Sequence, residues 1–463
     1  MALQSVAQAV DLSKPTARLD TPRHYRQIKN LTDTQRNAYF VALAAWQRGL
    51  QVTFHYEVTE LSERFTSLSN QGAFGEIFSV TDGKKTHFFR RSLGDLTSLE
   101  TSLLANDKPA TKECLTAAGI DTPAGIVLSP SKAYKAKKFV EQQSTDLFIL
   151  KPIDGSLSKD VEREVPAEEV VARLKARTEK NVLLEEFVAG PMYRVNVVGG
   201  LYVASYTFNP CAVVGDGKHS IKDLIELVKQ PLPFKEIHEE RMKYQLSDAD
   251  KARLQSLGYN EDTVLDFGEK IVINNTPSGE YGADHQDTTE TLPVEIRAVA
   301  AKAAKAMNLP VVGFDIIHGE DGRVVVLEGN QSPMVGSNVL PRVGTPPGNR
   351  VAEAIIDLYF PGSINNTRHV DAYFDFLAIT KMLIQGVASS ITVPTIYPHW
   401  EWKEFTIEVA QLNQEKWNKI RSKAAQLGLH VQAYSEQKGV TVAILAAPRR
   451  AKAFLSFISE TLQ

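Results

Sequence analysis

Three oxygen-bearing side chains are spaced so that they could bind a metal ion together. Asp315 stands in the middle of the apolar run VVGFDII, and Glu328 and Asn330 end the apolar run VVVLEGN. Between the runs lies Asp321-Gly322, a dipeptide typical of a tight hairpin turn. Side chains alternate faces along a strand, so Glu328 and Asn330 point to the same side. Counting back from the turn brings Asp315 opposite the region of Leu327 and Glu328.

Two carboxylates and one carboxamide oxygen form a hard oxygen site suited to Mg²⁺ or Mn²⁺. Magnesium prefers few protein carboxylates together with water and substrate phosphates, as in phosphoryl-transfer enzymes. Taken singly, each of Asp315, Glu328 and Asn330 could instead cap a turn or be a solvated residue at a strand end. Together, however, the three residues are expected to meet at one place on strands otherwise made of Val, Ile and Leu. This combination favours a metal site over three unrelated surface residues.

A phosphate-binding lysine should accompany such a metal. Lys151 ends the apolar strand LFILKP, where burying a lysine without an anion is costly. The turn-rich loop that follows, with Gly155 and Ser156, could cover phosphates with backbone N–H groups. Lys108 begins a helix, and helix N-termini attract anions. The alternatives are a snorkelling strand-end lysine for Lys151 and an ordinary surface lysine for Lys108.

The candidate residues lie on predicted strands and at the start of a predicted helix. The sequence therefore predicts a mixed α/β (α+β) fold. Its 463 residues suggest about three domains. Residues 1–105 predict an α/β domain with one hairpin turning at Asp82-Gly83. Residues 106–365 predict helices alternating with strands and hairpins, and residues 370–463 predict a small βαββα domain. The predicted helices are 33–49, 108–119, 166–178, 221–230, 293–310 and 348–360.

Composition excludes several classes of protein. With 43% hydrophobic and 23% charged residues the chain is globular, and a net charge of −3 argues against nucleic-acid partners. Its two cysteines, Cys114 and Cys211, form neither a disulfide framework nor a zinc pattern. The N-terminus lacks the features of a signal peptide, and no apolar run reaches the ~20 residues of a membrane span. We therefore expect a cytoplasmic protein without a membrane partner.

Taken in order, the landmark segments resemble the ATP-grasp superfamily of carboxylate–amine ligases. The resemblance extends from about Asn106 to Gly362. This segment is most similar to the ATP-grasp modules of cyanophycin synthetase and of bifunctional glutathione synthetases. The resemblance implies an ATP-grasp fold for 106–365. The segments are NDKPATKECLTAAGIDTP, ILKPIDGS, VLLEEFVAGPMYRVNVVGG, VVGDGKHSIKDLIE, FGEKIVINN, VGFDII and VLEGNQSP.

The resemblance also implies a role for each matching residue. Lys108 and Lys151 would contact ATP phosphates, and Asp315, Glu328 and Asn330 would bind magnesium. A hinge would read the adenine edge with its backbone groups; it consists of Glu185, Glu186, Phe187 and Val188. Two arginines would contact phosphate or a substrate carboxylate, with a structural role equally open; they are Arg194 and Arg342.

The implied reaction is an ADP-forming ligation through an acyl phosphate. It would join the carboxylate of an amino acid or small peptide to an amine, with the loops 154–160 and 276–284 closing to exclude water. The C-terminal domain carries no cluster of catalytic residue types, so oligomerisation into a homo-oligomer and substrate gating both stay open.

The sequence departs from the pattern of the family that it resembles at four places, one of which is a loop after Asn275 where the usual ST-Gly-Gly is reduced to PSGEYG. The other three are as follows. Met192 replaces an acidic ribose contact, the phosphate loop keeps only Gly155, and Asn274 and Asn275 replace an arginine. These departures motivate the alternative of a non-catalytic, ATP-binding regulatory protein, which the intact set of metal ligands argues against.

Overall fold

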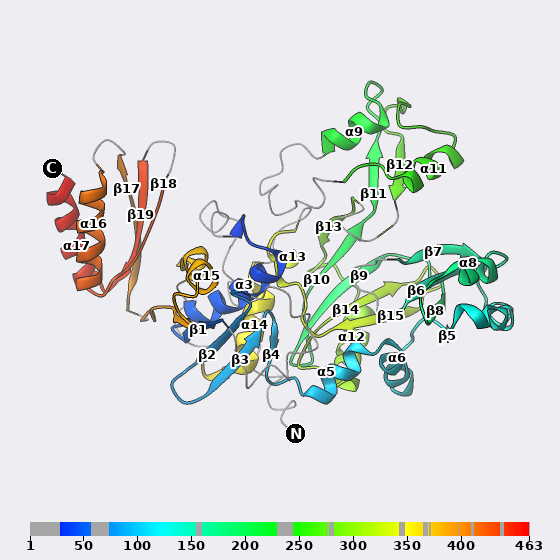
Figure 1. Ribbon diagram of the computed structural model, residues 1–463, viewed down its shortest axis with the longest axis horizontal. Helices are drawn as coiled ribbons and strands as arrows, with labels where there is room; N and C mark the ends of the chain where they lie inside the picture. Colours follow the sequence, from blue (N-terminus) through cyan, green and yellow to red (C-terminus); the bar gives the residue numbers. More distant parts are fainter. Residues whose placement is uncertain are drawn as a thin grey trace. The chain divides into compact units, whose positions relative to one another are not determined.

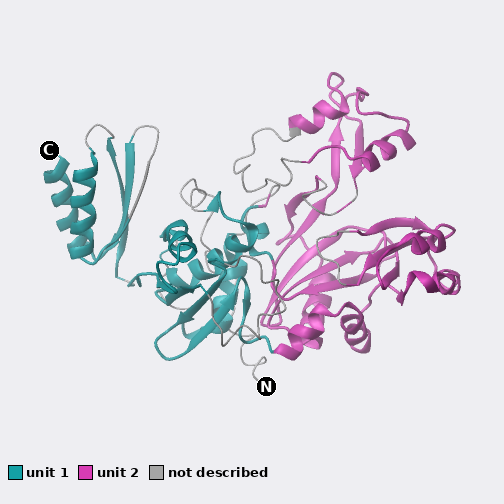
Figure 2. Cartoon of the chain, in the orientation of Figure 1, with its two compact units in different colours: residues 1–98, 334–340, 347–463 teal, residues 99–333, 341–346 magenta. Residues whose placement is uncertain are grey.

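The computed structural model describes most of the chain, in two compact units. Unit 1 comprises residues 1–98, 334–340 and 347–463, and unit 2 comprises 99–333 and 341–346 (Figure 2). The predicted boundaries near 105 and 365 stay predictions. The described residues are 28–56, 74–153, 160–228, 244–274, 276, 282–341, 348–363, 369, 372–397, 399–408, 412–435 and 439–462.

Unit 1 contains a five-stranded antiparallel sheet with the order β16-β1-β2-β3-β4. Strands β1 to β4 are labelled in Figure 1. The predicted turn joins β2 to β3, and the Asp82 carboxylate accepts the backbone N–H groups of Lys84 and Lys85. The first helix, α3, begins at a capping box made by Thr32 and Gln35. The elements are α3 (Asp33–Gln47), β1 (Gln51–His55), β2 (Ile77–Thr81), β3 (Thr86–Arg90), β4 (Leu93–Gly94), α13 (Val335–Val339), α14 (Arg350–Tyr359), η5 (Pro361–Ser363), α15 (Phe376–Ile384) and β16 (Ser390–Thr392).

The C-terminal part of unit 1 has the predicted order of strand, helix, hairpin and helix. Its three strands pair in the order β17-β19-β18, and apolar residues of the strands and the two helices form one core. The elements are β17 (Glu401–Glu408), α16 (Gln414–Gln426), β18 (His430–Ser435), β19 (Gly439–Ala446) and α17 (Pro448–Leu462).

Unit 2 contains a four-stranded antiparallel sheet with the order β5-β8-β6-β7. One face packs against short helices through a core that includes Phe148, Leu150, Val165 and Leu184. Because side chains alternate, the intervening residues of these strands lie on the other face. The elements are β5 (Gly125–Leu128), η2 (Pro130–Lys135), α7 (Ala136–Val140), β6 (Leu147–Pro152), β7 (Glu162–Pro166), α8 (Val170–Ala176) and β8 (Val182–Glu186).

A second antiparallel sheet of unit 2 has five strands in the order β13-β10-β9-β14-β15. Helix α12 covers one face, where Val195, Phe314 and Ile316 join the apolar core. The opposite face carries polar side chains together with a small apolar group that includes Ile317 and Val325. The elements are α5 (Leu99–Asn106), α6 (Lys108–Ala117), β9 (Met192–Val198), β10 (Leu201–Asn209), β13 (Asp284–Asp287), α12 (Val294–Ala306), β14 (Val311–His318) and β15 (Val324–Asn330).

A smaller part of unit 2 pairs β11 (Cys211–Val214) with β12 (Lys270–Asn274) and packs them on α9 (Ile221–Val228) and α11 (Asp248–Ser256). The sequence did not predict β7, β11 or β13, because these short strands depend on pairing with distant segments. All the ladders between described strands are antiparallel, and helices pack on them, so the predicted mixed α/β (α+β) class is confirmed. No helix in the described ranges is both long and apolar enough to cross a membrane.

Candidate active site

The hairpin of β14 and β15 places the predicted metal ligands on one face of the five-stranded sheet. Asp315 pairs with Glu328, and Gly313 pairs with Asn330. A bulge makes Leu327 an extra residue on β15, because Ile316 already pairs with Val326. The bulge therefore decides that Glu328 rather than Leu327 stands opposite Asp315.

The same cross-strand row continues into the neighbouring strands. Arg194 on β9 pairs with Asp315 on its one side and with Tyr206 of β10 on the other. Its Nε donates to one Asp315 carboxylate oxygen and its Nη2 donates to the other at 2.9 Å. Such a bidentate pair holds the planes of both groups in a fixed orientation. Arg194 thus positions the Asp315 carboxylate.

Gly313 keeps this face open beside the row. A Cβ at this position would lie 3.1 Å from the Asn196 Oδ1 atom and 3.2 Å from the Arg194 Cδ atom. Asn330, across the hairpin from Gly313, accepts the backbone N–H of Ser332 at 2.9 Å through its Oδ1 atom. This bond orients the carboxamide oxygen that the sequence predicts as a metal ligand.

Charged residues from helix α6 and several strands influence the pKa values of Glu328 and Arg194. Desolvation and the nearby Asp315 carboxylate raise the pKa of Glu328, while the charges of Arg194, Lys151 and Lys108 oppose that rise. The Glu328 side chain is still exposed, so solvent screens these effects. For Arg194, burial works against the charged form, but Asp315 outweighs burial and raises its pKa. Both predicted phosphate lysines therefore lie within electrostatic reach of the predicted metal ligands.

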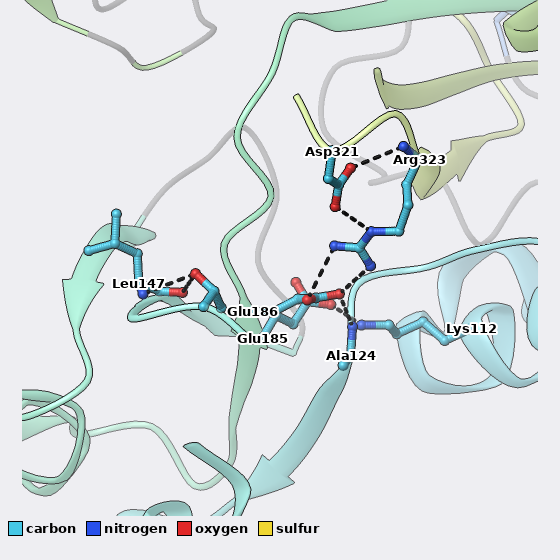
Figure 3. Close-up of polar contacts among 8 residues, drawn as sticks. Lys112, Ala124, Leu147, Glu185, Glu186, Asp321 and Arg323 are labelled. Carbon is cyan, nitrogen blue, oxygen red and sulfur yellow. Dashed lines mark hydrogen bonds and ion pairs between the residues drawn. The ribbon is translucent and has the colours of Figure 1, made fainter. Parts of the chain in front are cut away.

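Lys151 has an anion beside it. Its Nζ atom lies 2.5 Å from a carboxylate oxygen of Glu185. Lys112 pairs with the other oxygen of that carboxylate (Figure 3). Glu185 is only 2% exposed. Burial alone would raise the pKa of Glu185, but Lys151 and Lys112 outweigh it and lower the pKa. Lys151 is therefore not the unpaired lysine that the sequence suggested.

The hinge segment has some of its backbone groups already engaged. The N–H of Glu186 donates to Ala124 O and the N–H of Phe187 donates to Leu147 O, both at 2.9 Å. These two donors are already engaged within the protein, so an adenine would have to meet other backbone groups of the predicted hinge. The Glu186 carboxylate accepts the N–H of Ala124 and the guanidinium of Arg323 (Figure 3).

Arg323 ties the β14–β15 hairpin to this hinge. Its Nε donates to the Asp321 carboxylate at 2.6 Å, and its Nη1 donates to Glu186 at 3.1 Å. Burial opposes the charged guanidinium only weakly here, while the hydrogen bonds with Glu186 and Asp321 raise its pKa. The hairpin turn that carries Asp321 is thus connected to β8 by charged hydrogen bonds.

An apolar floor lies beside the charged row on the same face. Its buried members are Val188, Ile317 and Val325, and Met192 and Leu327 pack against them. Met192 pairs with Ile317 across β9 and β14, so the residue at the position where the resemblance implied an acidic ribose contact belongs to this floor. A flat apolar ring would fit such a surface better than a charged group would.

The remaining predicted residues fall into two groups. Lys108 lies in the first turn of α6, where the Asp107 side chain caps the helix by accepting the N–H of Ala110. Gly155, Ser156 and Arg342 lie outside the described residues, as does most of the two predicted closing loops.

The sequence reasoning missed two cations of the site. Lys112 lies one turn after Lys108 on α6, a spacing that puts both on one helix side and could have identified it. Arg163 lies in strand β7, which the sequence did not predict. The negative charge of Asp315 acts to raise the pKa of its guanidinium. Nothing in EREVP alone distinguishes Arg163 from a surface arginine.

These donors fit a hard divalent cation. Among the described residues no three His, Cys, Asp or Glu side chains gather as a metal cluster, so a site here must combine Asp315 and Glu328 with a carboxamide. The two carboxylates repel each other, as the raised pKa of Glu328 indicates, and a cation would relieve that repulsion. Carboxylate and amide oxygens are the ligands that magnesium and manganese prefer.

No protein-family profile matches the chain. Over 280 residues it is 27% identical to the cyanophycin synthetase of Trichormus variabilis, covering 58% of this chain and 31% of that protein. Over 345 residues it is 24% identical to the glutathione biosynthesis bifunctional protein of Clostridium perfringens, covering 71% of this chain and 41% of the relative. The chain is similar to ATP-grasp ligases. The resemblance predicted from the sequence is therefore confirmed.

The similarity is partial in length. The chain spans less than half of these relatives and about a third of the cyanophycin synthetase. Among solved structures, the bifunctional glutathione synthetase of Pasteurella multocida aligns with a TM-score of 0.48 and 21% identity, covering 62% of this chain and 40% of that one.

Proposed function

We propose that this chain is an ATP-dependent, ADP-forming carboxylate–amine ligase. It makes a peptide or amide bond from the carboxylate of an amino acid or small peptide and an amine. One observation carries the proposal: Arg194, Asp315 and Glu328 form a cross-strand row on the open face of the five-stranded sheet, with Asn330 beside it. The sequence similarity to cyanophycin synthetase and to the glutathione biosynthesis protein supports the same reaction class.

Asp315, Glu328 and Asn330 would hold the metal ion, magnesium or manganese. When bound, the ion neutralises charge on the phosphates of ATP. Arg194 keeps the Asp315 carboxylate in one orientation through its two hydrogen bonds. Preorganised ligands of this kind lower the cost of assembling the site with each substrate.

The other residues position the nucleotide. Val188, Ile317 and Val325 present an apolar surface for the adenine ring. Lys151 and Lys108 add positive charge near Glu328, where the phosphates would lie. Glu185 holds Lys151 in place, so the lysine would reach the phosphates from a fixed position. Gly155, Ser156 and Arg342 remain proposed contacts to phosphate or substrate.

The reaction proceeds in two balanced steps. A substrate carboxylate oxygen attacks the terminal phosphorus, the bond to the bridging oxygen breaks, and ADP leaves. The amine then attacks the acyl carbon, inorganic phosphate leaves, and the amine loses a proton. The residues of the chain bind and orient the reactants and stabilise charge on the transferring oxygens. Each step therefore depends on the positions of charged groups rather than on a covalent intermediate with the protein.

The test measures ADP release in mixtures of ATP, Mg²⁺ and pools of amino acids or dipeptides, with product masses read in parallel. We expect ADP release that depends on both a carboxylate and an amine, and a product mass equal to their sum minus water. Glu328→Gln should abolish this activity without changing the fold. Glu320→Gln is the matched control, because Glu320 is an exposed glutamate at the turn of the same hairpin.

Failure of every pool to support amine-dependent ADP release would reject the ligase. A second candidate would then be a non-catalytic, ATP-binding regulatory protein. Met192 supports this candidate, because it fills the apolar floor at the position where the family has an acidic ribose contact. In that case the chain should bind MgATP, and Glu328→Gln should weaken that binding without any turnover to lose.

A further inference from the structure

Strand β7 contains a bulge that changes where two of its side chains point. Phe148 of β6 pairs with Val165, and Leu150 pairs with Glu162. Ile149, between them, therefore faces two residues of β7, Arg163 and Glu164. Glu164 has a φ of +53°, a left-handed conformation that side chains rarely adopt. Such irregularities commonly redirect a side chain near a functional site.

The residues on either side of the bulge define the faces. Val165 belongs to the apolar core beneath the four-stranded sheet. Glu162 accepts a hydrogen bond from Nη1 of Arg177 at 3.0 Å, on the side of the sheet where α8 ends. Because both flanking residues lie on the helix side, the two bulge residues project from the opposite face. Lys151 and Glu185 lie on that opposite face as well, since Leu150 and Leu184 enter the core.

The Arg163 guanidinium is therefore directed toward the proposed nucleotide site. Burial lowers the pKa of Arg163, and the charges of Asp315 and Glu164 oppose this effect without reversing it. Asp315, on the five-stranded sheet, is thus close enough for its charge to act on this guanidinium. Its buried Nε atom donates to no oxygen among the residues that the structure describes. A buried N–H without an acceptor is costly, and a ligand oxygen would relieve that cost.

Two other cations near the row have carboxylate partners. Arg194 is paired with Asp315, and Lys151 is paired with Glu185. Arg163 thus offers the site a buried donor whose bond is not made within the described part of the chain. A guanidinium presents several N–H groups in a fork that matches the spacing of phosphate oxygens.

We propose that Arg163 binds the terminal phosphate of ATP in this site. The inference rests on the proposed nucleotide-binding function. It assigns to a strand residue a contact that the glycine-poor loop after Lys151 is poorly suited to make with backbone groups alone. Arg163 would hold the phosphoryl group from the side of the four-stranded sheet, opposite the metal ligands of the five-stranded sheet.

The test compares the binding of MgATP, MgADP and adenosine to the full chain by calorimetry, without amino-acid substrates. Arg163→Met should weaken MgATP binding about 10- to 100-fold, the loss expected for a charged hydrogen bond to phosphate. Binding of MgADP should change less than about threefold, and adenosine should bind as before. Arg163→Lys should recover part of the MgATP affinity, because it restores the charge but not the fork.

Arg173→Met is the matched control, because Arg173 is an exposed arginine of the adjacent helix, paired with Glu169. It should leave all three affinities unchanged, and thermal unfolding of each variant checks that the fold persists. Equal weakening of MgATP and MgADP by Arg163→Met, or weakening of neither, would overturn the assignment to the terminal phosphate. If the unsubstituted chain binds no nucleotide, both the proposed function and the Arg163 assignment fail. If it binds nucleotide but Arg163→Met does not selectively weaken MgATP binding, only the Arg163 assignment fails.

Discussion

Arg194 and Asp315 face each other on neighbouring strands, and the guanidinium of the arginine spans both oxygens of the carboxylate. Their side chains are only 13% and 11% exposed. On the other side of Asp315 stands Glu328, the second carboxylate of the row. Arg194 therefore offsets the repulsion between two carboxylates that the hairpin brings together.

We expect Arg194→Leu to lower the free energy of unfolding by about 3 kcal/mol or more, because it leaves Asp315 without its buried partner. Magnesium should restore part of this loss, since a bound cation would offset the repulsion between the Asp315 and Glu328 carboxylates. Urea unfolding with and without Mg²⁺ measures both effects, with Arg173→Leu as the exposed control. A loss below about 1 kcal/mol, the value typical of a surface pair, would contradict the buried role.

Glu185 holds two lysines, so its removal should cost more than the removal of either lysine. Glu185→Gln leaves Lys112 and Lys151 close together without a counter-ion, and we expect a loss of about 3 kcal/mol. Lys112→Met should cost clearly less, because Lys151 still neutralises the carboxylate. Chemical unfolding of both variants gives the order, and the reverse order would show that Glu185 does not organise the cluster.

Gly329 has no room for a side chain. A Cβ there would lie 2.8 Å from the ring of Phe314, with which Gly329 pairs across the hairpin. Gly329→Ala should therefore lower the free energy of unfolding by about 1–3 kcal/mol through overpacking. Gly362→Ala is the control, since a Cβ added at Gly362 would meet no atom within 4 Å.

A double substitution tests the cause of that loss. Phe314→Leu reduces the ring that the new methyl group would meet, so the cost of Gly329→Ala should be smaller in the Phe314→Leu background. Thermal or urea unfolding of the four proteins in this cycle measures the coupling. Strict additivity would mean that strain elsewhere in the strand, and not the Phe314 ring, causes the destabilisation.

Unit 1 contains a half-buried histidine, His430, whose titration should make the stability of the protein depend on pH. Burial lowers the pKa of His430 to about 4 from its usual 6.5, against the opposing effects of the Tyr373 carbonyl and Asp375. Its Nε2 atom lies 3.1 Å from that carbonyl, and its ring centroid lies 5.2 Å from that of Trp46. The folded state thus binds the proton more weakly than the unfolded state does.

The sign of the effect follows from this order of pKa values. The contribution of neutral His430 is fully present above pH 6.5 and is lost as the pH falls from 6.5 toward 4, by up to about 3 kcal/mol. His430→Gln keeps a donor for Tyr373 but does not titrate. Between pH 7 and pH 4.5, urea unfolding should show a larger stability loss in the unsubstituted chain than in His430→Gln. Parallel pH profiles would contradict the prediction.

Local signals in the sequence were sufficient for much of the site. The turn at Asp321-Gly322 and the alternation along the two apolar runs predicted that Asp315, Glu328 and Asn330 share one face, and the strand register places them so. The order of elements in the C-terminal part of unit 1 followed from hydrophobic periodicity in the same way. These features depend on residues close together in the chain.

Other features depend on partners that are distant in sequence. The counter-ion of Lys151 is Glu185, which β8 brings beside it only after the four-stranded sheet has formed. Strand β16 joins β1 across most of the chain length. The bulges at Leu327 and at Arg163 arise from a mismatch between two strands, and neither strand shows it alone. Arg163 could therefore not be separated from a surface arginine by its sequence.

Leu327 gives the hairpin a way to change what it recognises without changing its chemistry. Deleting this one residue would leave Glu328 opposite Asp315 and Asn330 opposite Gly313, because the regular register resumes on both sides of the bulge. The apolar floor would at the same time lose the Leu327 side chain that packs against it. Strand length at this point thus sets the shape of the apolar floor, the surface proposed for the adenine ring. A single-residue insertion or deletion here would change that shape while Asp315, Glu328 and Asn330 keep their places.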